Sequence, residues 1–133
     1  MREVKFRAWD KMQKELVKVN AIALNANCFD TKSYLHGSQP HLYDEDGVLH
    51  LLEDCELLQF TGLYDKNGQE IYEGDTISYG GVIYIVEYNE NDAGFLLKNM
   101  ESCWHDLDIE VARESKVIGN VYKDGDLNAS WQI

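Results

Sequence analysis

The sequence predicts a mainly β fold of the β-rich α+β class, in which an N-terminal hairpin packs on a small SH3-like C-terminal barrel. Three observations predict it. Short runs rich in β-branched and aromatic residues recur at close spacing along the chain. Asp, Asn and Gly residues that favour turns separate these runs. The clearest turn, Asp65–Gly68, lies between two apolar runs, and its Asn67-Gly68 pair is expected to supply the positive φ angles of a tight hairpin.

The first expected element is the N-terminal hairpin. Residues 4–10 alternate between apolar and mixed side chains, and residues 16–24 alternate again after a short polar connection. The segment from Asn25 to Asp46 collects turn-forming residues, and we interpret it as a long connection with one short strand near Tyr34 or Leu42.

The second half of the chain carries the stronger strand signals. The expected strands are residues 48–52, 57–60, 63–64, 70–72, 76–79, 82–88, 93–98 and 116–122. We therefore expect one domain over residues 1–133, with the hairpin and long connection in residues 1–58 and the small barrel in residues 59–123.

Charge is distributed unevenly along the chain. Of 133 residues, with a net charge of −12, the first 18 hold six basic and three acidic residues, and the other 115 hold six basic and 21 acidic residues. A body this acidic disfavours general binding to a phosphate backbone. No apolar run is long enough to span a bilayer and no secretory signal opens the chain, so we expect a cytoplasmic protein with no membrane contact.

No convergent catalytic set or cofactor-binding motif is visible, so we expect neither an enzyme nor a cofactor. Four histidines and three cysteines form only two close pairs, Cys103 with His105 and His36 with His41, and neither has the spacing of a structural zinc site. We expect no metal site. Cys55 lies between two acidic residues, which predicts a raised thiol pKa and low reactivity.

One further acidic pattern follows the last β hairpin. Asp106, Asp108 and Glu110 alternate, which predicts that their side chains share one face of a strand. We interpret this set as a solvated charged edge that discourages aggregation rather than as a cation site.

Five motifs in order resemble the YopX family of phage and prophage proteins from Gram-positive bacteria. The motifs are Lys5–Asp10, Leu58–Leu63, Asp65–Gly68, Glu70–Asp75 and Val117–Tyr122. The resemblance implies a β-rich fold and an origin in a mobile element, and it implies no activity and no catalytic residues. The shared motifs also have structural interpretations: Gly68 and Gly74 are expected in turns, and Phe60 and Tyr72 in the core.

We therefore expect a non-enzymatic phage accessory protein that binds another macromolecule or assembles with itself. One alternative is an acidic decoy that captures a host nucleic-acid-binding protein, and its candidate carboxylates are Asp44, Glu45, Asp46, Glu53, Asp54 and Glu56. A second alternative is a nucleic-acid-binding β-barrel that uses exposed aromatic side chains and the basic candidates Arg2, Lys5 and Arg7.

Overall fold

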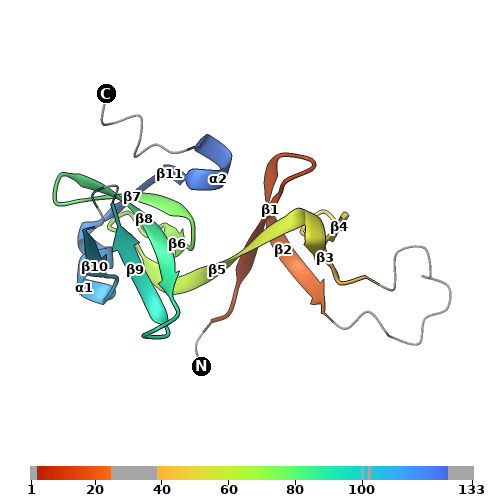
Figure 1. The fold of residues 1–133 in the computed structure, drawn as a ribbon, viewed down its shortest axis with the longest axis horizontal. Helices are drawn as coiled ribbons and strands as arrows, with labels where there is room; N and C mark the ends of the chain where they lie inside the picture. Colours follow the sequence, from red (N-terminus) through yellow and green to blue (C-terminus); the bar gives the residue numbers. More distant parts are fainter. Residues whose placement is uncertain (1–2, 25–38, 100, 102, 126–133) are drawn as a thin grey trace. The chain divides into compact units, whose positions relative to one another are not determined.

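The computed structural model describes residues 3–24, 39–99, 101 and 103–125, and these residues are mainly β (Figure 1). The chain divides into two compact units: the N-terminal unit, Phe6–Leu57, and the C-terminal unit, which combines Met1–Lys5 with Leu58–Ile133. The strands form two antiparallel sheets, and neither sheet closes. Among the residues described, no helix has the length and apolar character that crossing a membrane requires.

The helices and strands follow one another in a single order along the chain. They are β1 (Phe6–Asp10), β2 (Glu15–Ala23), β3 (His41–Asp44), β4 (Leu49–Leu51), the 3-10 helix η2 (Leu52–Asp54), β5 (Cys55–Tyr64), β6 (Glu70–Tyr72), β7 (Asp75–Tyr79), β8 (Val82–Asn89), β9 (Gly94–Lys98), β10 (Trp104–Asp106), α1 (Ile109–Glu114), β11 (Lys116–Asn120) and α2 (Val121–Asp124).

The N-terminal unit is built on the hairpin that the sequence predicts. Strands β1 and β2 pair antiparallel, from Arg7 opposite Lys18 to Asp10 opposite Glu15, which confirms the hairpin. Strand β3 adds to β2 and β4 adds to β3, so the sheet order is β4-β3-β2-β1, followed by β5. The expected strand near Leu42 is β3, whereas the alternative near Tyr34 lies outside the described residues.

The C-terminal unit contains the second sheet, in the order β10-β9-β8-β7-β11. Its buried core includes Ile77, Val86 and Leu97 from the sheet, together with Leu107 and Ala112. The predicted small SH3-like barrel is not confirmed, because the sheet stays open. Helix α1 stands between β10 and β11 in the chain and places Ala112 in the core, so helix packing covers apolar surface that strand closure was expected to cover.

The turn between β5 and β6 has a different geometry from the one that the Asn67-Gly68 pair predicts. Only Gly68 adopts a positive φ, +78°, and Asn67 does not. The Asp65 carboxylate supplies the missing constraint, because its Oδ1 accepts hydrogen bonds from the backbone N–H groups of Asn67 (2.8 Å) and Gln69 (2.9 Å). The turn is therefore set by an Asp side chain with one glycine rather than by two residues of positive φ.

Two of the sequence motifs meet in the C-terminal unit. Gly74 has φ +86°, its N–H donates to Val86 and its carbonyl accepts from Val121. The buried Asp75 accepts from the backbone of Tyr72 and from the side chain of Asn120. These contacts join two distant motifs into one turn, and the burial of Phe60 and Tyr72 confirms their predicted place in the core.

Two elements near the C-terminal end differ from the prediction. Strand β11 ends at Asn120, and Val121 begins the helix α2, because the Asn120 side chain accepts from the backbone N–H groups of Tyr122 and Lys123 and so caps a helix. Asp106, Asp108 and Glu110 do not share a strand face. Only Asp106 lies in a strand, while Asp108 caps α1 by accepting from the Val111 N–H at 2.9 Å and Glu110 lies in the helix.

Candidate functional site

A buried ionic cluster in the N-terminal unit is the most distinctive polar site of the described residues. Asp10 ends β1, Asp44 ends β3 and His50 is the central residue of β4. The His50 ring lies between the two carboxylates, with Nδ1 2.6 Å from Asp10 Oδ2 and Nε2 2.8 Å from Asp44 Oδ2. All three side chains are buried, with 6% or less of their surface exposed. We call these three residues the ionic cluster.

The same two carboxylates fix the turns that follow their strands. Asp10 Oδ1 accepts from the backbone N–H groups of Met12 and Gln13, at 2.9 and 3.0 Å. Asp44 Oδ1 accepts from the N–H groups of Asp46 and Val48, at 2.9 and 3.0 Å. Each Asp thus uses one oxygen to hold a turn and the other to hold the histidine. The cluster therefore couples two turns that lie far apart in the sequence.

The geometry determines the protonation state of the histidine. A carboxylate only accepts hydrogen bonds, so contact at both ring nitrogens requires both to carry a proton. Burial alone lowers the pKa of His50, but the hydrogen bonds and charges of Asp10 and Asp44 outweigh it and raise the pKa above its ordinary value. This arrangement favours the imidazolium form of His50, in which both ring nitrogens donate to carboxylates and neither is available as a general base.

Each carboxylate of the cluster has a pKa below its ordinary value. Burial raises the pKa of Asp10, but the hydrogen bond from His50 and those from the Gln13 and Met12 backbone overcome this effect. For Asp44 the hydrogen bond from His50 is the largest cause, and the backbone of Val48 and Asp46 adds to it. Both carboxylates are consequently charged at neutral pH, and they are compensated by the one imidazolium between them.

Cys55 lies next to the cluster at the start of β5. Burial is the main cause that raises the pKa of its thiol to about 11, and the negative charges of Asp10 and Asp54 add to it. The expected rise in the pKa of this thiol is confirmed, although burial contributes more than the neighbouring acids in the sequence. Such a thiol is a weak nucleophile at neutral pH, because only the thiolate attacks.

Two surface grooves adjoin the ionic cluster. The first is lined by Arg7, Glu15, Leu16, Val17, Lys18, Asp44, Glu45 and Asp46. The second is lined by Asp10, Met12, Gln13, Glu15, Val48, Leu49, His50, Leu51 and Asp54. Glu15 belongs to both grooves, so they open onto the same part of the N-terminal unit. The conformation of this surface depends on the two turns that the cluster holds.

The structure separates the six candidate carboxylates into different environments. Asp44 was expected on an exposed binding surface, but it is buried in the ionic cluster with 4% of its surface exposed. Glu45 and Asp46 are exposed on the turn that Asp44 holds. The remaining three, Glu53, Asp54 and Glu56, lie in or beside η2, where Glu56 forms an ion pair with Lys11 at 3.7 Å.

The basic candidates are largely committed to interactions within the protein. Lys5 forms ion pairs with Glu70 and, at 3.3 Å, with Glu3, and its ammonium lies 5.1 Å from the centre of the Phe60 ring. The hydrogen bond to Glu70 is the main cause that raises the pKa of Lys5. Arg7 is half-buried beside the first groove and also interacts with other residues. Arg2 lies outside the described residues.

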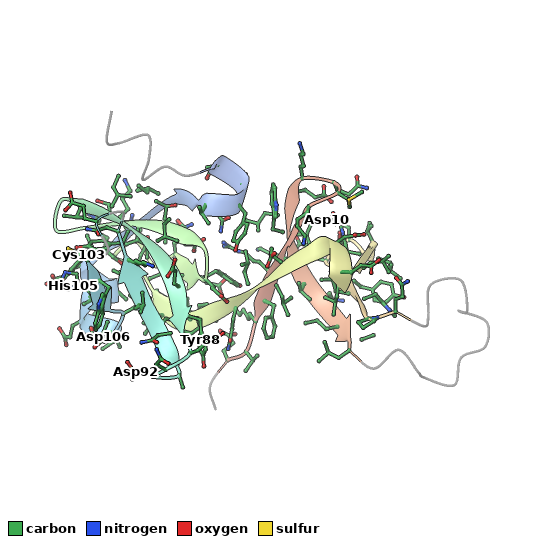
Figure 2. The ribbon with its side chains drawn as sticks, in the orientation of Figure 1. Asp10, Tyr88, Asp92, Cys103, His105 and Asp106 are labelled. Atoms are coloured by element: carbon green, nitrogen blue, oxygen red, sulfur yellow. The ribbon has the colours of Figure 1, made fainter. Side chains whose placement is uncertain are left out.

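The pair Cys103 and His105 lies at the β10 edge of the C-terminal unit, where Figure 2 labels both residues beside Asp106. The His105 ring packs edge-on against Tyr79 and Tyr84, with ring centres 5.9 and 5.6 Å away. His105, on the outer strand β10, thus joins an aromatic cluster with Tyr79 of β7 and Tyr84 of β8. His36, the partner proposed for His41, lies outside the described residues.

Sequence reasoning missed the ionic cluster, although two signals pointed to it. Asp10 and Asp44 each stand immediately before a turn, which is the position from which a carboxylate holds backbone N–H groups. His50 lies between Leu49 and Leu51, where strand alternation turns it to the opposite face from both leucines. Nothing local shows that the three side chains meet, because the register of β1 to β4 brings them together.

The fold and the site define a small, mainly β protein whose N-terminal unit is braced by a buried ionic cluster. The model of the family described as YopX protein matches residues 5–127, and the chain belongs to the YopX family. No curated protein matches the sequence. Protein EF1440 from Enterococcus faecalis, known from a crystal structure, is similar with a TM-score of 0.63 and 22% identity over 96% of this chain and 99% of that chain. At this identity the likeness shows the fold.

Proposed function

We propose that this protein is a non-catalytic accessory protein of a phage or prophage that acts in the bacterial cytoplasm and binds a basic protein partner. The binding surface is the acidic turn, which we define as Glu45 and Asp46 together with Glu15 across the first groove. The proposal rests on the observation that the buried Asp44 carboxylate fixes the backbone of this turn through two hydrogen bonds.

A fixed turn favours binding because less conformational freedom is lost when a partner docks. Ordering a flexible side chain or loop at an interface costs about 0.5–1.5 kcal/mol for each group immobilised. Here the turn is held before any partner arrives, and Glu45 also donates its backbone N–H to Lys18 at 3.2 Å. The exposed carboxylates are then presented in a constant arrangement. A net charge of −12 adds long-range attraction for a basic partner.

The state of the potentially reactive groups supports a non-catalytic role. Both ring nitrogens of His50 are occupied by carboxylates, and the Cys55 thiol is held in its protonated form. General base catalysis needs a free acceptor, and nucleophilic catalysis needs an activated group. The engagement of Lys5 with Glu70 likewise favours a protein partner over nucleic acid, because it neutralises one of the basic candidates.

The test is a capture experiment from host lysate with a tagged full-length chain. The bait variant is Glu45→Gln with Asp46→Asn, which removes two charges and leaves the backbone hydrogen bonds of the turn in place. The matched control is Glu87→Gln with Glu90→Gln, which makes the same charge change at exposed positions of the C-terminal unit. We expect one basic nucleic-acid-binding protein to be retained at low salt and released by high salt or by added duplex DNA.

The comparison of the two variants decides the proposal. The acidic-turn variant should lose the partner, with at least a tenfold weaker affinity in a titration of the purified pair, and the control should keep it. Equal losses of affinity in both variants would show that the interaction depends on net charge alone, and this would overturn the assignment of the binding surface to the acidic turn. Capture of RNA or DNA in place of a protein would support the nucleic-acid alternative. Association only with further copies of this chain would support self-assembly.

A further inference from the structure

A set of metal-binding atoms comes together where Asp10, His50 and Cys55 meet. These residues belong to β1, β4 and β5, and one ligand atom from each lies within 4.8 Å of the other two. A carboxylate oxygen, an imidazole nitrogen and a sulfur are all established zinc ligands. We propose that Asp10, His50 Nδ1 and Cys55 Sγ form a zinc site, which we call the proposed zinc site.

The fourth member of the neighbourhood, Asp44, orients the histidine for this role. Its Oδ2 lies 2.8 Å from His50 Nε2 and fixes the proton on that nitrogen. A histidine that binds a metal through one nitrogen commonly donates its other N–H to a carboxylate, which sets the tautomer and the direction of the ring. The remaining nitrogen, Nδ1, faces Asp10 at 2.6 Å, on the side where the other two ligands lie.

The donor atoms select the type of metal. One sulfur, one nitrogen and one oxygen favour zinc or another borderline transition metal, whereas magnesium and calcium require oxygen ligands. The second groove, with a volume of about 400 Å³, is lined by Asp10 and His50, two of the three proposed ligands. A water molecule from this groove would complete four-coordinate geometry. A second set of possible metal ligands, Glu15, Asp44 and His50, lies on the other side of the His50 ring and offers only oxygen and nitrogen atoms.

Binding exchanges protons for the metal. Zinc takes the place of the Nδ1 proton that His50 shares with Asp10 and of the Cys55 thiol proton, and both protons leave to solvent. Zinc bonds of about 2.0–2.3 Å put neighbouring ligand atoms roughly 3.3 Å apart or more. The contact of 2.6 Å between Nδ1 and Asp10 Oδ2 must therefore open by less than about 1 Å. The backbone bonds to the other Asp10 oxygen remain in place.

The experiment is a titration of the chelator-treated full chain with Co²⁺, which replaces zinc and reports its ligands by absorption. A bond between cobalt and a thiolate gives a charge-transfer band in the near ultraviolet. We expect this band at one equivalent of Co²⁺, its displacement by Zn²⁺, and a rise in the unfolding temperature on adding Zn²⁺. Cys55→Ser and Asp10→Asn should each weaken Co²⁺ binding at least tenfold, and Cys55→Ser should remove the band.

The matched controls are Cys103→Ser, at an exposed cysteine of the C-terminal unit, and Cys28→Ser, which accounts for the third thiol. Both controls should keep the band, and circular dichroism checks that every variant is folded. The proposal is overturned if micromolar Co²⁺ gives no band or if the band survives in Cys55→Ser. Co²⁺ binding without a thiolate band overturns it as well, because Cys55 would then not be a ligand.

Discussion

Removal of the His50 ring should destabilise the N-terminal unit strongly, because it leaves two buried carboxylates without their shared cation. In the metal-free protein, His50→Ala removes the hydrogen bonds of 2.6 and 2.8 Å to Asp10 and Asp44. The two Asp side chains stay buried, since their other oxygens remain bonded to the backbone of their turns. Their charges then repel each other without the imidazolium between them.

The size of the effect follows from the burial of the cluster. Breaking a buried ion pair by removing one partner typically costs about 3–5 kcal/mol. The second groove reaches Asp10 and His50, so water can enter and solvate the exposed charge in the variant. We therefore expect the lower end of the range, a loss of about 3 kcal/mol in the free energy of unfolding.

Urea unfolding in the presence of a chelator measures the loss, with circular dichroism as the signal. The matched control is His41→Ala on the neighbouring strand β3, where the half-buried ring contacts the Gln39 carbonyl at 2.9 Å and packs in a T-shaped pair with Tyr43. We expect the control to lose about 0.5 kcal/mol. Equal losses for His41→Ala and His50→Ala would contradict this expectation, because the cluster would then contribute no more than an ordinary surface contact.

Three further predictions concern pH and the turns. The folded pKa of His50 is raised from 6.5, so its stabilisation is complete below about pH 6.5 and declines as the pH rises through the folded pKa. The folded pKa values of Asp10 and Asp44 are lowered from 3.8, so their stabilisation is lost as the pH falls through those values. The urea midpoint measured against pH in chelator should therefore show a maximum between these limits, and an unchanged alkaline decline in His50→Ala would contradict this. Gly74→Ala should lower the free energy of unfolding by about 2 kcal/mol in thermal unfolding, because the φ of Gly74 is +86° and the new Cβ would lie 2.9 Å from the Tyr122 ring. The control is Gly68→Ala, where the φ is +78° but no atom lies within 4 Å of the new Cβ, so its loss should be smaller. Equal losses would argue against a clash with Tyr122. Asp65→Ala should lower the free energy of unfolding by about 3 kcal/mol, because the backbone N–H groups of Asn67, Gln69 and Val117 lose their acceptor. Hydrogen exchange should accelerate at these three amides, and unchanged protection there would contradict the role assigned to Asp65.

Features set by neighbouring residues could be predicted from the sequence. The alternation in residues 4–10 and 16–24 predicts β1 and β2, because a strand places successive side chains on opposite faces. Gly68 and Gly74 adopt positive φ as their motifs predict, since glycine tolerates that conformation without strain. The details of the Asp65 turn were less accessible, because an Asp side chain replaces one of the two positive φ angles.

Features that depend on distant pairing could not be predicted in the same way. The sheet of the C-terminal unit stays open, and α1 brings Ala112 into its core. The sequence signal for α1 was Asp108, which caps the helix, but its alternation with Asp106 and Glu110 is also typical of a strand. The ionic cluster depends on the pairing of four strands, which places His50 between residues that precede it by 40 and 6 positions. Such meetings follow from strand register, which local propensity does not determine.

The protonation of the His50 ring decides whether the N-terminal unit holds a buried imidazolium or a neutral histidine. The measurement is a long-range proton–nitrogen correlation spectrum of the ¹⁵N-labelled, metal-free chain at about pH 6.5, where an ordinary histidine is half protonated. We expect Nδ1 and Nε2 of His50 both to carry protons at this pH, because its pKa is raised above the ordinary value. A signal showing one unprotonated ring nitrogen would contradict it, since one of the two carboxylate contacts could then not be a hydrogen bond.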